Sequence, residues 1–251
     1  MHKPSWTTIR DTGSRRKVRI LVSLALSGSL LLPACFFRKH TAPSAPKVSA
    51  PVRIAFLPMN VPQGNADLLW LSMGTTVLMV GTARSAPDLE PVSLWESLPA
   101  ALQSLGTSRT VTSDIAELTA TRLSARWAAE GQLQAASNSV SLRIDFIPSQ
   151  PSLVPFRYEK PGTPEQMPPR IQEAYEQFLR YLIVRPLDEQ KNKPFDLKRL
   201  KEIADAVDAE YGWFATAKPG AAGKLVEDLS KSDPGFAKLL FSPTLYPVLG
   251  K

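Results

Sequence analysis

The sequence predicts an α/β fold with a mixed β-sheet and packed helices, followed by a small all-α module at the C-terminus. Between residues 52 and 160, apolar stretches with the two-residue period of strands alternate with stretches of helical period. Beyond residue 170, apolar residues recur only at every third or fourth position, which indicates helices. A chain of 251 residues is long enough to bury the core that such a fold requires.

The chain begins with the parts of a bacterial export signal, expected over residues 1–34. A basic region ends at Arg19, an apolar stretch runs from Ile20 to Leu32, and small residues lie near a cleavage point. The apolar stretch is shorter than the roughly 20 residues that a bilayer-spanning helix needs. A short membrane anchor or a buried helix is the alternative interpretation.

Cys35, the single cysteine of the chain, follows this apolar stretch. Leu32, Pro33 and Ala34 precede it and resemble the lipobox of bacterial lipoproteins, in which the cysteine is diacylated and becomes the mature N-terminus. Several acyl chains anchor a protein stably, because each buried methylene contributes about 0.8 kcal/mol. We therefore expect membrane binding through acylated Cys35. With no second cysteine in the chain, no intramolecular disulfide is expected.

Three further features bear on export and location. Arg15 and Arg16 resemble a twin-arginine signal, and an ordinary basic region is the alternative. Phe36 follows the cysteine in place of the Asp that is typical of inner-membrane retention. In a Gram-negative host, we therefore expect the periplasmic face of the outer membrane rather than the inner membrane. Residues 35–51 are rich in Pro, Ala and Ser, which predicts the lipidated Cys followed by a flexible tether.

The predicted α/β domain covers residues 52–160 in the order β-α-β-α-α-β-β-β. We expect strands over 52–58, 89–95, 127–134, 140–147 and 153–160, and helices over 66–83, 98–105 and 113–123. Ser113 is the expected N-cap of the last helix. Apolar side chains occupy every second position from Val140 to Phe146, which predicts a strand with one buried and one solvated face. The helix over 66–83 is expected to bury a single face.

Four stretches of this domain resemble a known family. VRIAFLPMNV, LLWLSMGTTVLMVGTARSAPDLEPVSL, RLSARWAAEGQLQ and VSLRIDFI follow the pattern of the TolB amino-terminal-like domain, whose relatives include the flagellar lipoprotein FlgO. The resemblance covers about residues 52–147, includes Leu57-Pro58 and Glu130-Gly131, and implies the α/β fold. The Asp common in the first helix of the family is replaced here by Ser72-Met73-Gly74, so no role of that Asp is carried over.

A proline-rich stretch at 161–170 predicts a linker, and a helical module is expected over 171–251. Its expected helices cover 171–184, 197–214 with Asp196 as N-cap, 221–231 and 234–241. Ala204–Phe236 resembles one degenerate tetratricopeptide repeat, with a generic helical hairpin as the alternative. A single repeat cannot bury its own face, so the first of these helices or the α/β domain must cover it. The C-terminal strip 241–249 is expected to pack back on the helices.

Few residues suit catalysis. Both histidines, His2 and His40, precede the predicted domains, which removes histidine-based triads, Cys-His dyads and imidazole zinc sites from them. Glu130, Asp145 and Glu159 lie near one end of the predicted sheet and are candidates for acid–base work, but we expect them to be solvated. The sequence contains no phosphate-binding glycine motif, and no cofactor or metal is expected.

These observations favour a non-enzymatic, lipid-anchored cell-envelope protein that acts as an interaction or assembly module for an envelope protein partner. The alternatives are a ligand-sensing or carboxylate-based enzymatic domain and a purely structural spacer. A deep polar cleft at the carboxyl ends of Leu57 and Leu94 would favour ligand sensing or catalysis. The net charge of +7 lies mostly in the leader, so no nucleic-acid partner is expected. The sequence does not indicate an oligomeric state.

Overall fold

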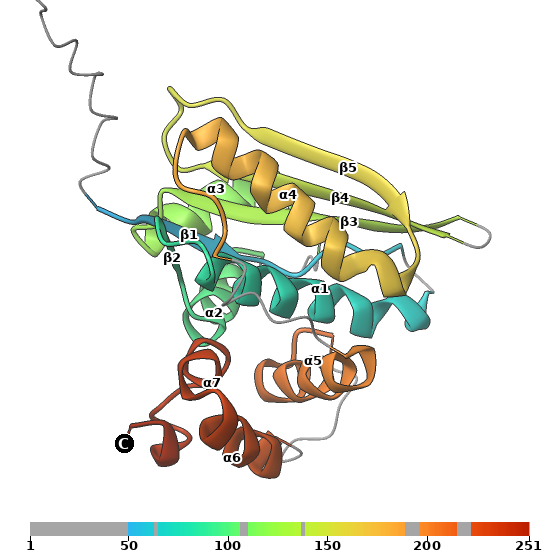
Figure 1. The fold of residues 1–251 in the computed structure, drawn as a ribbon, viewed down its shortest axis with the longest axis vertical. Coiled ribbons are helices and arrows are strands. Elements are labelled where there is room, and N and C mark those ends of the chain that lie inside the picture. The colour runs from blue at the N-terminus through green and yellow to red at the C-terminus, as the bar shows by residue number, and fades with distance from the viewer. Residues whose placement is uncertain are drawn as a thin grey trace, which may run out of the picture. The chain divides into compact units, whose positions relative to one another are not determined.

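The computed structural model describes residues 50–62, 65–105, 110–136, 139–188, 196–214 and 222–250. Within them a five-stranded mixed sheet has helices on both faces, and further helices follow at the C-terminal end (Figure 1). The predicted α/β class with C-terminal helices is confirmed. Among these residues, no helix has the length and apolarity needed to cross a membrane. The predicted export and lipidation residues lie outside the described part; they are Arg15, Arg16, Leu32, Pro33, Ala34 and Cys35.

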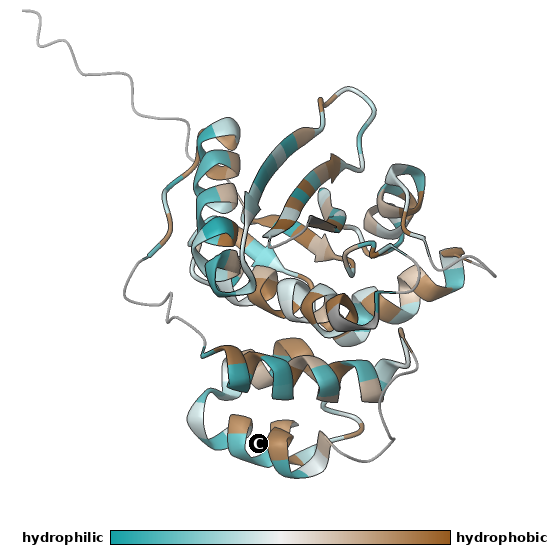
Figure 2. Cartoon of the chain, turned by 90° about the vertical axis from the view of Figure 1, so that its right-hand side faces the viewer, coloured by the Kyte–Doolittle hydropathy of each residue, from teal (hydrophilic) through white to brown (hydrophobic). Residues whose placement is uncertain are grey.

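The sheet has the strand order β2-β1-β3-β4-β5. The strands are β1 (Val52–Phe56), β2 (Leu89–Pro91), β3 (Trp127–Ala136), β4 (Ser139–Pro148) and β5 (Phe156–Gly162). β1 runs parallel to both of its neighbours, whereas β3, β4 and β5 form an antiparallel meander. Hydrophobic and hydrophilic residues alternate along strands of the sheet, as expected for strands with two different faces (Figure 2).

Helices cover the two faces of the sheet unequally. They are α1 (Ala66–Arg84), α2 (Leu94–Leu105), α3 (Ser113–Arg122), α4 (Met167–Leu182), α5 (Leu197–Tyr211), α6 (Ala222–Ser232) and α7 (Pro234–Leu240). α1 and α4 lie on one face, where Phe146 of β4 stacks on Phe178 of α4 with ring centroids 3.9 Å apart. α2 and α3 lie on the other face, toward which Asp145 of β4 points.

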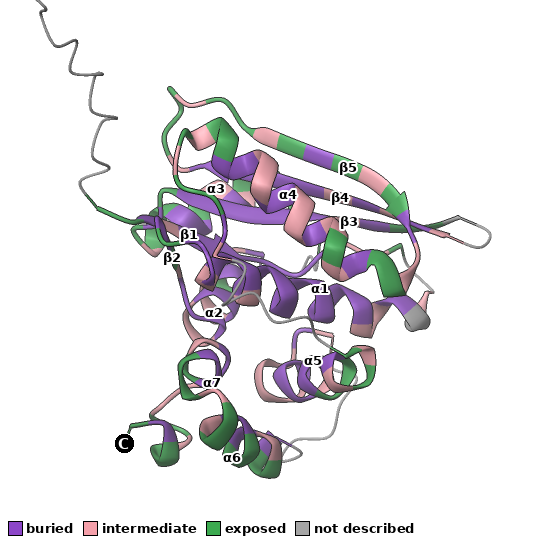
Figure 3. Ribbon diagram, viewed as in Figure 1, coloured by how far each residue is buried: buried purple, intermediate pink, exposed green. Residues whose placement is uncertain are grey.

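α1 is buried all round rather than on the single face that the sequence predicts. Residues 71–80 are all buried (Figure 3). The reason is that α5 packs against α1, in addition to the sheet and α4. Gly74 lies at this contact, where a β-carbon would stand 3.5 Å from Leu200 of α5, an ordinary van der Waals distance. Ser72 Oγ donates a 2.6 Å hydrogen bond to the carbonyl of Met59, which ties α1 to the segment after β1.

Residues 161–170 do not form the predicted linker. β5 extends to Gly162, the 3₁₀ helix η1 covers Pro164–Gln166, and α4 begins at Met167. Prolines suit such a start, because the first residues of a helix have no intrahelical partner for their N–H groups. α4 packs on β5 and α1, so it belongs to the layers of the sheet rather than to the C-terminal helices.

Two element boundaries also differ from the prediction on the other face of the sheet. β2 is shorter than the predicted strand over 89–95, and α2 begins at Leu94 instead of residue 98. The N-cap of α3 is Thr112, whose side chain accepts the N–H of Ile115, and not Ser113. This leaves the Ser113 hydroxyl available for another contact.

The C-terminal helices follow the sequence prediction closely. Asp196 caps α5 as predicted, and α5 ends at Gly212, whose φ of 63° lies in the left-handed region that favours glycine. α5 is covered by α1, in line with the expectation that the α/β domain covers it. Phe241 and Leu249 are buried, so the C-terminal strip packs back on the helices. The tetratricopeptide resemblance of Ala204–Phe236 stays a prediction.

Gly131 of β3 is the position at which the sheet tolerates no side chain. A β-carbon there would lie 2.0 Å from the carbonyl oxygen of Arg143 and 2.7 Å from Sδ of Met59. We predict that Gly131→Ala lowers the free energy of unfolding by about 3 kcal/mol or more, measured by urea denaturation. Gly223→Ala in α6 is the control, because no atom lies within 4 Å of its β-carbon position. The control should stabilise by up to about 1 kcal/mol. An unchanged midpoint for Gly131→Ala would contradict this packing.

Candidate functional site

Glu130 and Asp145 stand directly opposite each other on β3 and β4. The sequence predicts solvated carboxylates, and for these two residues that prediction is wrong. They are 3% and 2% exposed. The physical reason is that α3 packs on this part of β3 and β4. Burial of two neighbouring carboxylates costs several kcal/mol per ion unless partners compensate, so their partners decide the chemistry of the site.

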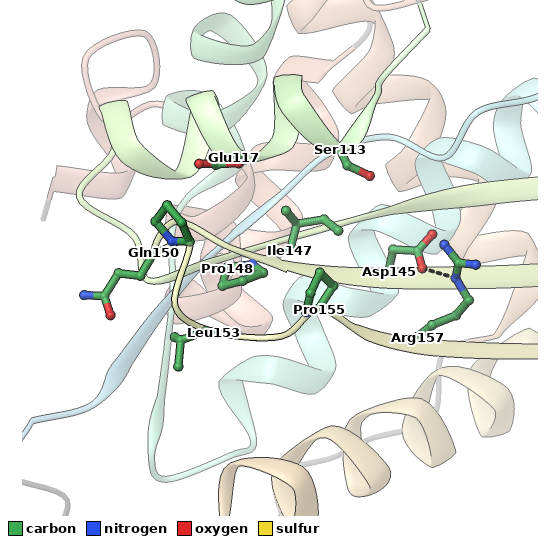
Figure 4. A pocket seen from close by; sticks show the side chains of 10 residues that line it. Ser113, Glu117, Asp145, Ile147, Pro148, Gln150, Leu153, Pro155 and Arg157 are labelled. Carbon is green, nitrogen blue, oxygen red and sulfur yellow. Dashed lines mark hydrogen bonds and ion pairs between the residues drawn. The ribbon is translucent and has the colours of Figure 1, made fainter.

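Asp145 is paired with two arginines. Nε of Arg157, the residue opposite it on β5, donates to Oδ1 at 2.5 Å. Nε of Arg143 lies 2.9 Å from Oδ2, as an ion pair without the alignment of a hydrogen bond. The hydrogen bond to Asp145 raises the pKa of Arg157. Figure 4 shows the Asp145 and Arg157 side chains pointing toward each other. Both carboxylate oxygens of Asp145 are therefore engaged.

Glu130 has a weaker set of partners. Ser113, at the start of α3, donates from Oγ to Oε1 of Glu130 at 3.2 Å. Burial, and then the nearby carboxylate of Asp145, raise the pKa of Glu130, although Ser113 and the two arginines act in the opposite direction. The site thus holds one carboxylate neutralised by guanidinium groups and one that retains its proton to higher pH than an ordinary glutamate.

Glu159 completes the trio of candidate carboxylates. It lies on β5 opposite Arg143 and is exposed, as the sequence predicts. The structure therefore brings all three carboxylates to one face of three neighbouring strands. The solvated face of β4 was predictable from its alternation as far as Arg143, but the burial of Asp145 on that face was not. The approach of Arg157 was not, because it depends on the register of β5.

A pocket of about 460 Å³ lies beside this cluster, between α3 and the β4–β5 connection (Figure 4). Its apolar lining comes from Ile147, Leu153 and three prolines, and its polar lining from Ser113, Glu117, Asp145, Gln150 and Arg157. Glu130 is not among the lining residues. Leu57 and Leu94 are not among them either, so this is not the cleft that would have favoured ligand sensing on sequence grounds.

Farther from α3, the same face of the sheet is open to solvent. It presents a set of exposed or half-buried polar side chains, which we call the open face: Gln132, Gln134, Ser141, Arg143, Arg157 and Glu159. On the opposite face of β5, Tyr158 and Lys160 instead contact Glu173 of α4. The open face thus remains uncovered by the described helices.

A second hollow, of about 440 Å³, lies between α5 and α6. Its charged lining includes Arg199, Glu202 and Asp205, and these belong to ion pairs along α5 with spacings of three and four residues. Within the described ranges, no group of three or more His, Cys, Asp or Glu side chains could hold a metal ion.

Comparisons with known proteins give little further information. No family model matches the chain, and no curated protein matches it significantly. Among solved structures, the C-terminal domain of LpoB from Salmonella enterica is similar at 14% identity and a TM-score of 0.30, covering 47% of this chain and 87% of that one. A TM-score of this size is too low to indicate a shared fold.

The raised pKa of Glu130 predicts a pH dependence of stability. Between the pKa values of the unfolded and folded states, the folded state binds more protons, so stability falls as pH rises through this window. Glu130→Gln removes the charged form, so we predict that it raises the free energy of unfolding at pH 7 by roughly 1 kcal/mol. The variant should also lose less stability than the wild type as the pH rises toward 7. Urea denaturation from pH 4 to pH 8 measures both.

Glu159→Gln is the matched control, because Glu159 lies on the same face and is exposed. Its effect at pH 7 should stay within about 0.5 kcal/mol. If Glu130→Gln were less stable than the wild type at pH 7, the charged form of Glu130 would be favourable in the folded protein, contrary to this description.

Proposed function

We propose that this chain is a non-enzymatic, lipid-anchored interaction module of the bacterial cell envelope, and that the open face binds an envelope protein. The observation that carries the proposal is the open face itself: a row of polar side chains on β3, β4 and β5 that the described helices leave uncovered. Acylation of Cys35 would hold this surface at the membrane, and residues 36–51 would connect it to β1.

The partners of the buried carboxylates favour binding over catalysis. Acid–base catalysis by two carboxylates requires that both reach one substrate. The pocket reaches Asp145, whose oxygens are held by Arg143 and Arg157, but it does not reach Glu130. The cluster therefore supports a structural role, in which it orients the two arginines on the open face.

The chemistry of the open face fits a protein partner. Amide, hydroxyl, guanidinium and carboxylate groups alternate across it, and polar protein interfaces use such groups for about one hydrogen bond per 100–200 Å². Arg157 is 61% exposed in its side chain, and a guanidinium has five N–H groups, so donors remain beyond those used by Asp145. Arginines held in place in this way are frequent anchors of protein interfaces.

Ligand sensing is the second candidate, and the pocket is the observation that favours it. Its volume lies within the range of small-molecule sites, and its lining combines apolar walls with a few polar groups. A small ligand there would contact Asp145 and Arg157 and thereby couple the pocket to the open face.

Site-specific photo-cross-linking in the native host tests the proposed function. We predict that a photoreactive residue at Gln134 or Glu159 yields a discrete adduct with an envelope protein. The same residue at Lys198, exposed on α5, is the control and should not yield that adduct. Adducts that form from position 198 alone would place the interaction on the C-terminal helices and contradict the open face as the binding surface.

Cys35→Ala tests the anchor in the same cells. The wild-type chain should carry a diacylglyceryl-sized addition in its intact mass and should fractionate with membranes, whereas the variant should do neither. Unmodified, non-membrane wild-type protein would contradict the lipid anchor.

A further inference from the structure

Exposed apolar side chains gather at the edge of the sheet where the tether enters. β1 begins at this edge, β4 and α4 end there, and β5 begins there (Figure 1). Val154, in the β4–β5 connection, is 68% exposed, and Ile183, after α4, is 86% exposed. Tyr181, two residues before Ile183, is also exposed, and its hydroxyl donates to the carbonyl of Val154 at 2.8 Å. We call Val154, Tyr181 and Ile183 the edge patch.

Asp88 fixes this patch beside the entry of the tether. Its carbonyl accepts the N–H of Val52, the first residue of β1, at 2.8 Å. Its carboxylate accepts the backbone N–H of Arg185 at 2.9 Å and the guanidinium of Arg185 at 2.6 Å. Arg185 lies two residues after Ile183. The end of the tether and the edge patch are therefore held on the same side of the domain.

The backbone at Ile183 indicates a role outside the domain. Ile183 has φ 57° and ψ 44°, in the left-handed region that glycine or asparagine usually occupies at the end of a helix. A β-branched residue is rare there because its side chain crowds the backbone. The exposed side chain gains little packing within the described domain to offset this strain. Strain of this kind clusters at functional surfaces.

Arginines outnumber carboxylates in the segments around the edge patch, although Arg84 and Arg180 pair with Asp233 and Glu176 from outside these segments. The segments that meet at this edge are 50–53, 84–90, 122–127, 148–156 and 180–188, and together they contain six arginines and three carboxylates. Arg126, Arg180 and Arg185 are exposed, and of these Arg180 and Arg185 also form ion pairs with Glu176 and Asp88. A guanidinium has five N–H groups, so such a pair leaves donors for a further anion. Exposed aliphatic residues, a tyrosine and arginines together are typical of surfaces that lie in the headgroup region of an anionic bilayer.

We propose that this edge of the domain rests on the anionic membrane surface, with the edge patch inserted among the lipid headgroups and the exposed arginines against the lipid phosphates. The proposal rests on the proposed anchoring through Cys35. Residues 36–51 can span at most about 55 Å even when fully extended, so the anchor would keep this edge within reach of the bilayer at high effective concentration. The open face would then stand away from the membrane and be accessible to a partner.

Fluorescence quenching on the acylated full-length mature protein tests this orientation. Val154→Cys and Ile183→Cys, each labelled with an environment-sensitive fluorophore, report on the patch, since Cys35 as a thioether does not react. Leu245→Cys is the control, because Leu245 is similarly exposed but follows α7. In phosphatidylethanolamine–phosphatidylglycerol vesicles with a nitroxide-labelled lipid, positions 154 and 183 should be quenched and position 245 should not. Quenching should be weaker in phosphatidylcholine vesicles.

A charge variant tests the electrostatic part. Arg126→Gln should lower the ratio of docked to undocked protein about fivefold, the effect of removing one charge near an anionic surface. Lys198→Gln, which removes an exposed charge on α5, should leave the ratio unchanged.

Three outcomes would overturn the proposed docking, and they differ in whether the proposed lipid anchor is also contradicted. If the acylated protein shows no more quenching at 154 and 183 than at 245, the edge does not touch the bilayer, although the anchor stands. If position 183 becomes shielded only after addition of solubilised envelope proteins, a protein covers the patch instead. If intact mass shows no acyl group on Cys35, both the anchor and the docking fail.

Discussion

The face of the sheet that α3 partly covers is arranged around two buried carboxylates that lie next to each other. Glu130 and Asp145 lie opposite each other beneath α3, where two like charges cannot be accommodated without compensation. Arg157 and Arg143 neutralise Asp145, while Ser113 is the hydrogen-bond partner of Glu130. Because side chains alternate along a strand, a slip of one residue in β5 would turn Arg157 to the α4 face and remove the main partner of Asp145. The folded domain is therefore stable only in the register that places Arg157 of β5 opposite Asp145 of β4.

The same constraint determines which surfaces stay free. α3 must begin at Ser113 to reach Glu130, and it then covers only part of β3 and β4. The distal polar side chains of β3, β4 and β5 remain open as a consequence. On the opposite face, α4 and α1 bury the apolar side chains, and α5 covers α1 in turn. In the two proposals, each side of the domain has one role. The edge with the tether would meet the membrane, the open face would meet the partner, and α1, α4 and α5 bury the apolar core on the remaining side.

Much of the fold was predictable from the sequence, because periodicity and caps report local structure. The α/β class, the alternating burial in the first half of β4 and the Asp196 cap are examples. Burial of Glu130 and Asp145 was not predictable, since no local pattern shows where α3 packs. The all-round burial of α1 depends likewise on α5, which follows far along the chain. The prolines of 161–170 suit both a linker and the start of a helix, and only packing on β5 decides between them.

The titration of the Glu130 carboxyl, followed by ¹³C NMR in the folded protein with Glu130→Gln for assignment, tests the central claim most directly. We expect a midpoint above the ordinary value for glutamate, because burial and the neighbouring Asp145 disfavour the charged form. A midpoint at or below the ordinary value would mean that the carboxylate is solvated or well paired. In that case the buried pair would not determine how α3 and the arginines are arranged on this face of the sheet.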